Sequence, residues 1–138
     1  MIQSIHSTLA YTVLAVLLIA VINAFLGLSS KRNFTKNDRS ISLIGLILCH
    51  IQLVVGLILW VTSPLGKDAM SQMSNSAMRL TAVEHPLINI IAIVLITIGW
   101  SKHKKEESSN GKFKKIGVFY AIGLLLILSR IPWSNWMA

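Results

Sequence analysis

Three histidines, His6, His50 and His85, lie in or beside long apolar stretches of the chain. A neutral imidazole ligates a metal ion or haem iron through one ring nitrogen, and it also links two helices through a hydrogen bond. Inside a bilayer such a side chain faces the protein interior and needs a partner, so each is a candidate for a functional site. For one histidine alone the interhelical hydrogen bond is the better interpretation, whereas three in one small chain favour a bound group.

The apolar stretches predict helices that cross a membrane. Of the 138 residues, 54% are hydrophobic and only 13% are charged, whereas about a quarter of a soluble domain is charged. Apolar runs cover 9–28, 41–62, 82–100 and 116–128, and each approaches the roughly 20 residues that cross about 30 Å of hydrocarbon. We expect an all-α membrane protein with one domain over 1–138 and helices at about 4–29, 40–62, 76–103 and 114–131. Short connections predict an up-down-up-down four-helix bundle.

The basic residues predict which side of the membrane each connection occupies. Ten of the thirteen lie in two segments that such a bundle places at one end: Lys31, Arg32, Lys36, Arg39, Lys102, Lys104, Lys105, Lys112, Lys114 and Lys115. Lysine and arginine accumulate on the cytoplasmic side, so both termini are expected outside. The net charge of +8 is therefore a topology signal that also favours anionic lipid, and no nucleic-acid partner is predicted. The single cysteine, Cys49, excludes a disulfide framework.

Helical periodicity indicates which residues face the bundle interior. On the third expected helix, His85 shares a face with Asn89 and Gly99, a polar and small stripe in a helix rich in Ile, Leu and Val. On the second helix, a small and polar face lies roughly 100° to 160° from His50 and comprises Gly45, Cys49, Gln52 and Gly56. That helix is expected to use one face for packing and another for a ligand. The amides of Gln52 and Asn89 are partners for the alternative hydrogen bonds.

Haem b suits several imidazoles in a dry helix bundle, because two neutral histidines on facing helices ligate its iron. Counted from the expected cytoplasmic ends at about 1.5 Å per residue, His6 lies at roughly 35 Å, His50 at roughly 15 Å and His85 at roughly 24 Å. His6 and His50 are then too far apart to share one iron, so His85 belongs to either pair. Diagonal helices leave more room than neighbours about 8 to 10 Å apart, which favours His6 with His85. The sequence is compatible with one haem or more.

Charged residues near the outer end extend this hypothesis. Arg79 precedes His85, and Arg130 ends the fourth expected helix on the same side, so both are candidates to bind haem propionates. Snorkelling at the membrane interface is the alternative. Glu84 is expected to pair with Arg79, to orient a histidine or to reach the headgroups. His103 lies among lysines beyond the apolar run, and we interpret it as a solvated loop residue.

Several short motifs resemble a family of small bacterial inner-membrane proteins with four helices, described as cytochrome b-like. The similar segments are His6-Ser7-x-Leu9, His50-x-Gln52-Leu53, Gly56-Leu57-Ile58-Leu59, Glu84-His85, Ile96-Thr97-Ile98-Gly99 and Arg130-Ile131-Pro132-Trp133. The resemblance covers essentially the whole chain. It implies a multi-pass protein of the bacterial inner membrane, and it implies haem more firmly than any activity.

Three functions compete at this stage. The first is single-electron transfer by a haem b protein between a membrane quinol and a partner, a role that needs no catalytic base or nucleophile, so no enzyme activity is assigned. The second is that of an accessory subunit in a larger respiratory or other membrane complex, with histidines as interhelical links. The third is copper handling, because Met70, Met73 and Met78 present soft thioethers on the outer side.

Overall fold

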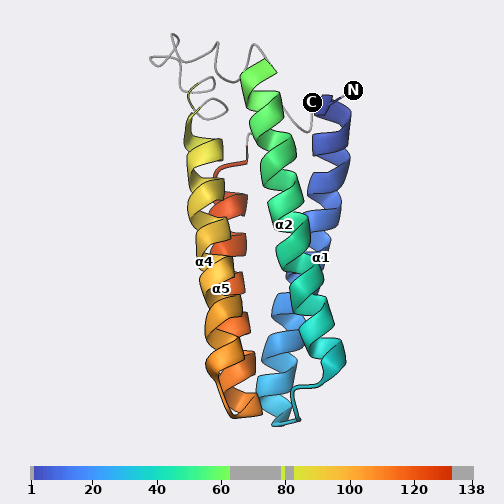
Figure 1. Ribbon diagram of the computed structural model, residues 1–138, viewed down its shortest axis with the longest axis vertical. Helices are drawn as coiled ribbons and strands as arrows, with labels where there is room; N and C mark the ends of the chain where they lie inside the picture. Colours follow the sequence, from blue (N-terminus) through green and yellow to red (C-terminus); the bar gives the residue numbers. More distant parts are fainter. Residues whose placement is uncertain (1, 63–78, 80–82, 132–138) are drawn as a thin grey trace.

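The computed structural model describes residues 2–62, 79 and 83–131, and these form long α-helices. The helices are α1 (Ile2–Ser30), α2 (Lys36–Thr62), α4 (His85–Lys105) and α5 (Ser109–Ser129). Figure 1 shows them side by side in one bundle, with the α1–α2 and α4–α5 connections at the same end. Consecutive helices of each pair therefore run in opposite directions. The all-helical fold expected from the sequence is confirmed for the described residues.

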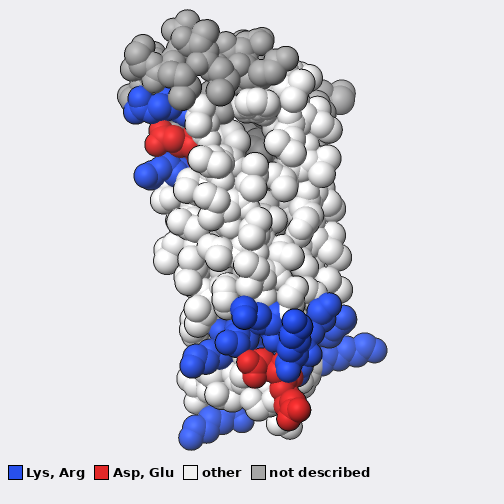
Figure 2. All heavy atoms as spheres, turned by 60° about the vertical axis from the view of Figure 1, so that its left-hand side comes forward, with Lys and Arg blue, Asp and Glu red and all other residues white. Residues whose placement is uncertain are grey.

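Length and composition make three of these helices candidate membrane spans. They are Ser4–Ser30, Lys36–Thr62 and His85–Lys105. Helix α5 is also long, but it carries Lys112, Lys114 and Lys115 near its start, which shortens its apolar run. A fourth span therefore stays a prediction. In Figure 2 a broad uncharged band separates the two ends of the molecule, and most of the basic side chains gather at one end.

The packing places α1 against α2 and α5, and α4 against α5 and α2. Among the described helices, α1 and α4 are thus diagonal to each other. Small residues allow close approach of α4 and α5, since a Cβ added at Gly123 would lie 2.6 Å from a side-chain carbon of Ile96. The Tyr120 hydroxyl donates a hydrogen bond to the backbone oxygen of Ser42 across 2.8 Å. This bond connects the other diagonal pair, α2 and α5, through the core.

The packing face expected on the second helix is confirmed. Gly45 and Cys49 are buried, and Gln52 and Gly56 are half-buried toward the bundle, whereas His50 is exposed. Most of the other exposed large side chains on α2 are aliphatic, as expected of a surface that faces lipid: Ile44, Ile47, Ile51, Val54, Leu57, Ile58 and Val61.

A buried carboxylate organises the connection between α1 and α2. Asp38 is 3% exposed, and its carboxylate accepts hydrogen bonds from the Thr35 backbone N–H at 2.8 Å and from the Asn23 amide at 2.8 Å. The Arg32 guanidinium binds both carboxylate oxygens at 2.8 and 2.9 Å. Thr35 directly precedes α2 and Asp38 lies three positions later, so the carboxylate satisfies an N–H that the helix start leaves unpaired. Lys31, with φ 56°, ends α1 in the left-handed conformation common after helices.

The interpretation of His103 as a solvated loop residue is wrong. Helix α4 continues to Lys105, and His103 is 1% exposed within it. Its ring packs between Phe34, at 5.4 Å between centroids, and Trp100, at 4.5 Å. Its Nδ1 donates to the Trp100 backbone oxygen. Neighbouring lysines in sequence point elsewhere because successive residues differ by about 100° around a helix.

The connection between α4 and α5 is much shorter than the expected loop. Helix α5 begins at Ser109 rather than near 114, because the Ser108 side chain accepts a hydrogen bond from the Gly111 N–H at 3.0 Å and caps the helix.

At the opposite end of the bundle, α4 begins at His85 and has Pro86 in its first turn. Proline is tolerated there because the N–H groups of the first turn have no partner within the helix. Part of the expected earlier helical segment, 76–78 and 80–82, lies outside the described residues.

Candidate functional site

His6 and His85 meet at the end of the bundle opposite the basic end. His6 lies in the second turn of α1 and His85 is the first residue of α4. Their ring centroids are 6.3 Å apart and the ring planes make an angle of 80°. These helices are diagonal partners, so the two imidazoles meet across the bundle. Of the two pairs considered from the sequence, this is the one that the structure brings together.

The end of α5 fixes the orientation of His85. His85 Nδ1 lies 3.0 Å from the backbone oxygen of Arg130. A carbonyl oxygen only accepts, so this contact places the proton on Nδ1 and leaves the lone pair on Nε2. The Asn89 amide nitrogen lies 3.1 Å from Nδ1 and 3.4 Å from Nε2, and it donates to the His85 backbone oxygen at 2.6 Å. Histidines that ligate metals commonly donate their other ring N–H to a carbonyl in this way.

Helix α2 supports His6 from its small face. Gln52 donates from its amide nitrogen to the His6 backbone oxygen across 2.9 Å. A Cβ added at Gly56 would lie 3.3 Å from His6 Cε1 and 3.7 Å from Nδ1, so glycine makes room for the ring. Among the described residues, the buried His6 Nδ1 and Gln52 Oε1 have no hydrogen-bond partner. If His6 Nδ1 carries the ring proton, the lone pair of its imidazole is on Nε2.

Two arginines near the pair are bridged by one carboxylate. Arg79 Nε lies 3.6 Å from one oxygen of Glu84, and Arg130 Nε lies 3.6 Å from the other. The expected pairing of Glu84 with Arg79 is therefore confirmed. The side chains of Arg79, Arg130 and Glu84 are 42%, 45% and 37% exposed, so solvent screens these pairs. Both guanidinium groups lie at the end of the bundle where the histidines meet.

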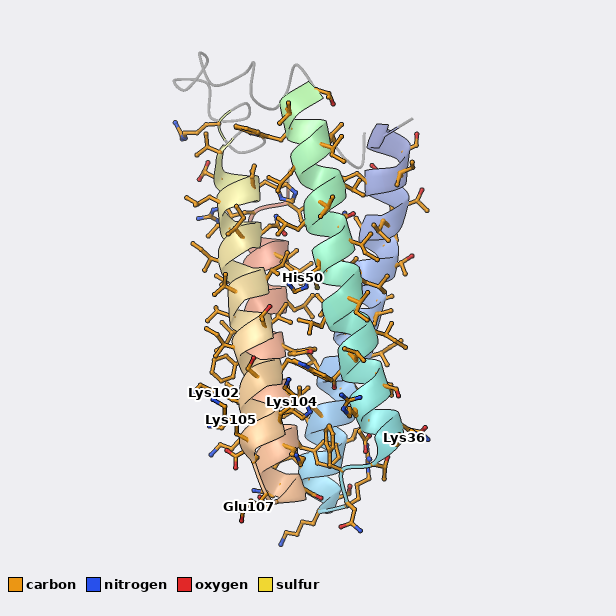
Figure 3. The ribbon with its side chains drawn as sticks, in the orientation of Figure 1. Lys36, His50, Lys102, Lys104, Lys105 and Glu107 are labelled. Atoms are coloured by element: carbon orange, nitrogen blue, oxygen red, sulfur yellow. The ribbon has the colours of Figure 1, made fainter. Side chains whose placement is uncertain are left out.

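His50 lies apart from this pair. It is exposed, midway along α2 (Figure 3), and its Nδ1 lies 2.8 Å from the Leu46 backbone oxygen one turn earlier in the same helix. The ring is therefore held against its own helix and does not join His85. No group of three His, Cys, Asp or Glu side chains in the described part of the chain is arranged to hold a metal ion.

The chain matches no protein-family model, no curated protein and no solved structure.

The separation of the His6 and His85 rings can be compared with that of two imidazoles that hold one metal ion. Two imidazoles that bind one metal ion from opposite sides, each at about 2.0 to 2.1 Å, have ring centroids about 6 to 6.5 Å apart. The observed separation is 6.3 Å. The contact of His85 Nδ1 with the Arg130 backbone oxygen leaves the Nε2 lone pair of His85 available to a metal ion. Both histidines could be predicted from the sequence, but the Arg130 backbone oxygen could not, since any residue type supplies that acceptor.

Proposed function

We propose that the chain binds haem b between His6 and His85 and transfers single electrons within a membrane. The observation that carries this proposal is the 6.3 Å contact between two imidazoles from diagonal helices. If both histidines hold the iron, they would leave no coordination position for a substrate, which favours electron transfer over oxygen or small-molecule chemistry. Bound there, the haem supplies a one-electron redox centre.

The surrounding residues have distinct roles in this proposal. His85 is held by the Arg130 backbone oxygen, and His6 has room for its ring because Gly56 has no side chain. Arg79 and Arg130 both pair with Glu84. In this proposal their guanidinium groups leave Glu84 and bind the two carboxylates of the porphyrin. A quinol of the membrane pool is the proposed electron donor, with a second membrane protein or complex as acceptor.

The same proposal includes a location. The basic end of the bundle, where the α1–α2 and α4–α5 connections lie, faces the cytoplasm. The chain is then a multi-pass protein of a bacterial inner membrane, as the resemblance to cytochrome b-like proteins implies, with both termini in the periplasm. Exposed serines at either end provide a test. A membrane-impermeant maleimide should label Ser4→Cys but not Ser108→Cys in intact spheroplasts, and the reverse pattern contradicts this orientation.

Haem binding is tested on protein purified from cells that are supplied with a haem precursor. A reduced-minus-oxidised optical spectrum should show a single b-type alpha band, with about one iron per chain by elemental analysis. His85→Ala should lose the band, while His50→Ala should keep it, because His50 lies outside the pair. A well-folded, colourless wild-type protein without iron contradicts the proposal. Copper in that analysis would instead favour metal handling, whose methionines lie outside the described residues.

One observation favours the accessory-subunit alternative. Edge-to-face contacts between aromatic rings occur at centroid separations of about 4.5 to 7 Å, so the His6 and His85 contact is also ordinary packing. The His85 to Arg130 bond likewise serves as an interhelical link without any ligand. Isolation of a colourless chain in stoichiometric complex with a larger membrane protein supports this alternative.

A further inference from the structure

His50 presents a hydrogen-bond acceptor on the outer surface of a membrane span. It lies about 21 Å from the Lys36 end of α2 and about 18 Å from the Thr62 end, at about 1.5 Å per residue. Its depth therefore corresponds to the middle of the hydrocarbon layer. Its exposed position (Figure 3) contrasts with the buried Cys49 that precedes it. A polar side chain at this depth is costly unless it has a partner.

The hydrogen bond within α2 determines what kind of partner His50 needs. Nδ1 lies 2.8 Å from the Leu46 backbone oxygen, and a carbonyl only accepts, so Nδ1 carries the proton. Nε2 then has a lone pair, and no described residue donates a hydrogen bond to it. The missing partner is a donor. A second copy of the chain with the same histidine opposite would bring two acceptors together, so a symmetric His50 contact does not satisfy either ring.

Depth restricts the donor further. Phospholipid headgroups and sterol hydroxyls stay near the interface, about 15 Å from the bilayer centre. A hydroquinone is different, because its ring carries two hydroxyl donors and is apolar enough to enter the hydrocarbon layer. The exposed aliphatic neighbours Ile47, Ile51 and Val54 provide an apolar surface for such a ring.

The position of His50 along α2 relates it to the candidate haem ligands. Gln52, two residues later, bonds the His6 backbone oxygen, and Gly56 lies against the His6 ring. His50 is thus about 9 Å along the helix axis from Gly56, which lies against the His6 ring. We infer that His50 Nε2 accepts a hydrogen bond from a hydroxyl of a membrane hydroquinone that binds on the outer face of α2. The choice of a redox-active ligand rests on the proposed function, but the binding itself needs no haem.

The inference is tested without haem, on the full chain in lipid nanodiscs with [15N]histidine. The probe is a decyl-substituted trimethylhydroquinone kept reduced under argon, and its dimethyl ether is the matched control without donors. The hydroquinone should shift the His50 Nε2 resonance saturably. A net hydrogen bond contributes about 0.5 to 1.5 kcal/mol, so the dimethyl ether should bind roughly two- to tenfold more weakly.

Two variants make the outcome decisive. His50→Leu should bind both probes equally, whereas Ile51→Leu should keep the preference for the hydroquinone. Both positions are exposed, so we expect both variants to fold. Circular dichroism verifies this. Equal binding of the two probes to the wild-type chain, or an unchanged preference in His50→Leu, overturns the inference. A His50 shift that depends on protein concentration and needs no probe also overturns it, in favour of a second copy. If wild-type protein from cells supplied with a haem precursor is colourless and lacks iron, the haem proposal fails, while a positive result in the nanodisc test leaves the His50 site standing.

Discussion

His85 and Arg130 join the start of α4 to the end of α5, with His85 Nδ1 donating to the Arg130 backbone oxygen across 3.0 Å. The acceptor is a main-chain atom, so its presence does not depend on the residue type at position 130. The guanidinium group of the same residue has a separate role, because it pairs with Glu84. One position thus provides both a tie to the imidazole and a charge at the membrane surface.

Because the backbone and the side chain of Arg130 have different roles, Arg130→Ala should affect haem binding only slightly. The backbone tie to His85 remains, so the b-type band should persist. Exposed ion pairs contribute about 0.2 to 1 kcal/mol, so haem affinity should fall by less than about tenfold. Haemin titration of the purified chain measures this, with Arg130→Lys as the charge-conserving control. Complete loss of the band in Arg130→Ala means that the side chain, rather than the backbone, holds the site.

Gly56 should control the fit of His6. A methyl group at this position would lie 3.3 Å from His6 Cε1, a contact that a small ring movement relieves, so Gly56→Ala should retain haem. Gly56→Leu is too large for such relief and should displace the imidazole, weakening haem affinity by about tenfold or more. Gly45→Ala is the matched control on the same helix, since its nearest contact would be 3.6 Å. Unchanged haem affinity in Gly56→Leu contradicts the placement of His6 against α2.

Asp38 should matter for stability and not for haem. Its removal leaves the donors of Asn23 and Thr35 without their acceptor. Arg32 is 38% exposed at its side chain and regains water, so we expect Asp38→Ala to lower the free energy of unfolding by about 1 to 3 kcal/mol. Denaturant titration in detergent micelles measures this value. Glu107→Ala, at an exposed position, should change stability by no more than about 0.5 kcal/mol, and equal effects of the two variants would be inconsistent with the buried network.

His103 should behave as a core residue. Its ring is enclosed by Phe34 and Trp100, so we expect His103→Ala to lower the free energy of unfolding by about 1 to 3 kcal/mol. Lys104→Ala, at the next and exposed position, should be close to neutral. The same titration compares them. A neutral His103→Ala would support the original interpretation of a solvated side chain.

Much of the bundle could be predicted from the sequence, because apolar runs indicate the membrane-spanning helices and their periodicity indicates which face is buried. The helical content, the diagonal relation of α1 and α4 and the small packing face of α2 all follow from residue size and spacing. The exposed position of His50 agrees with the separate face expected for it.

The sequence did not predict where α4 ends, because a single local contact decides the boundary of the helix. Heights along the third helix were counted from residue 101, near the end of its apolar run, but α4 continues to Lys105 before the Ser108 cap. Counted from Lys105 and Ser30, His85 lies at about 30 Å and His6 at about 36 Å, which reduces their separation along the bundle to an amount that helix tilt accommodates. His103 is buried because its ring packs between Phe34 and Trp100, and its lysine neighbours in the sequence do not indicate these contacts.

Electron paramagnetic resonance of the oxidised, haem-loaded chain tests the joint role of His6 and His85 most directly. Two imidazole ligands make ferric haem low-spin, and loss of one produces a high-spin signal in chains that still retain haem. We predict a low-spin spectrum for the wild type and for His50→Ala, and a high-spin spectrum or loss of haem for His6→Ala. A low-spin spectrum that survives in His6→Ala, or one that disappears in His50→Ala, contradicts ligation by His6 and His85.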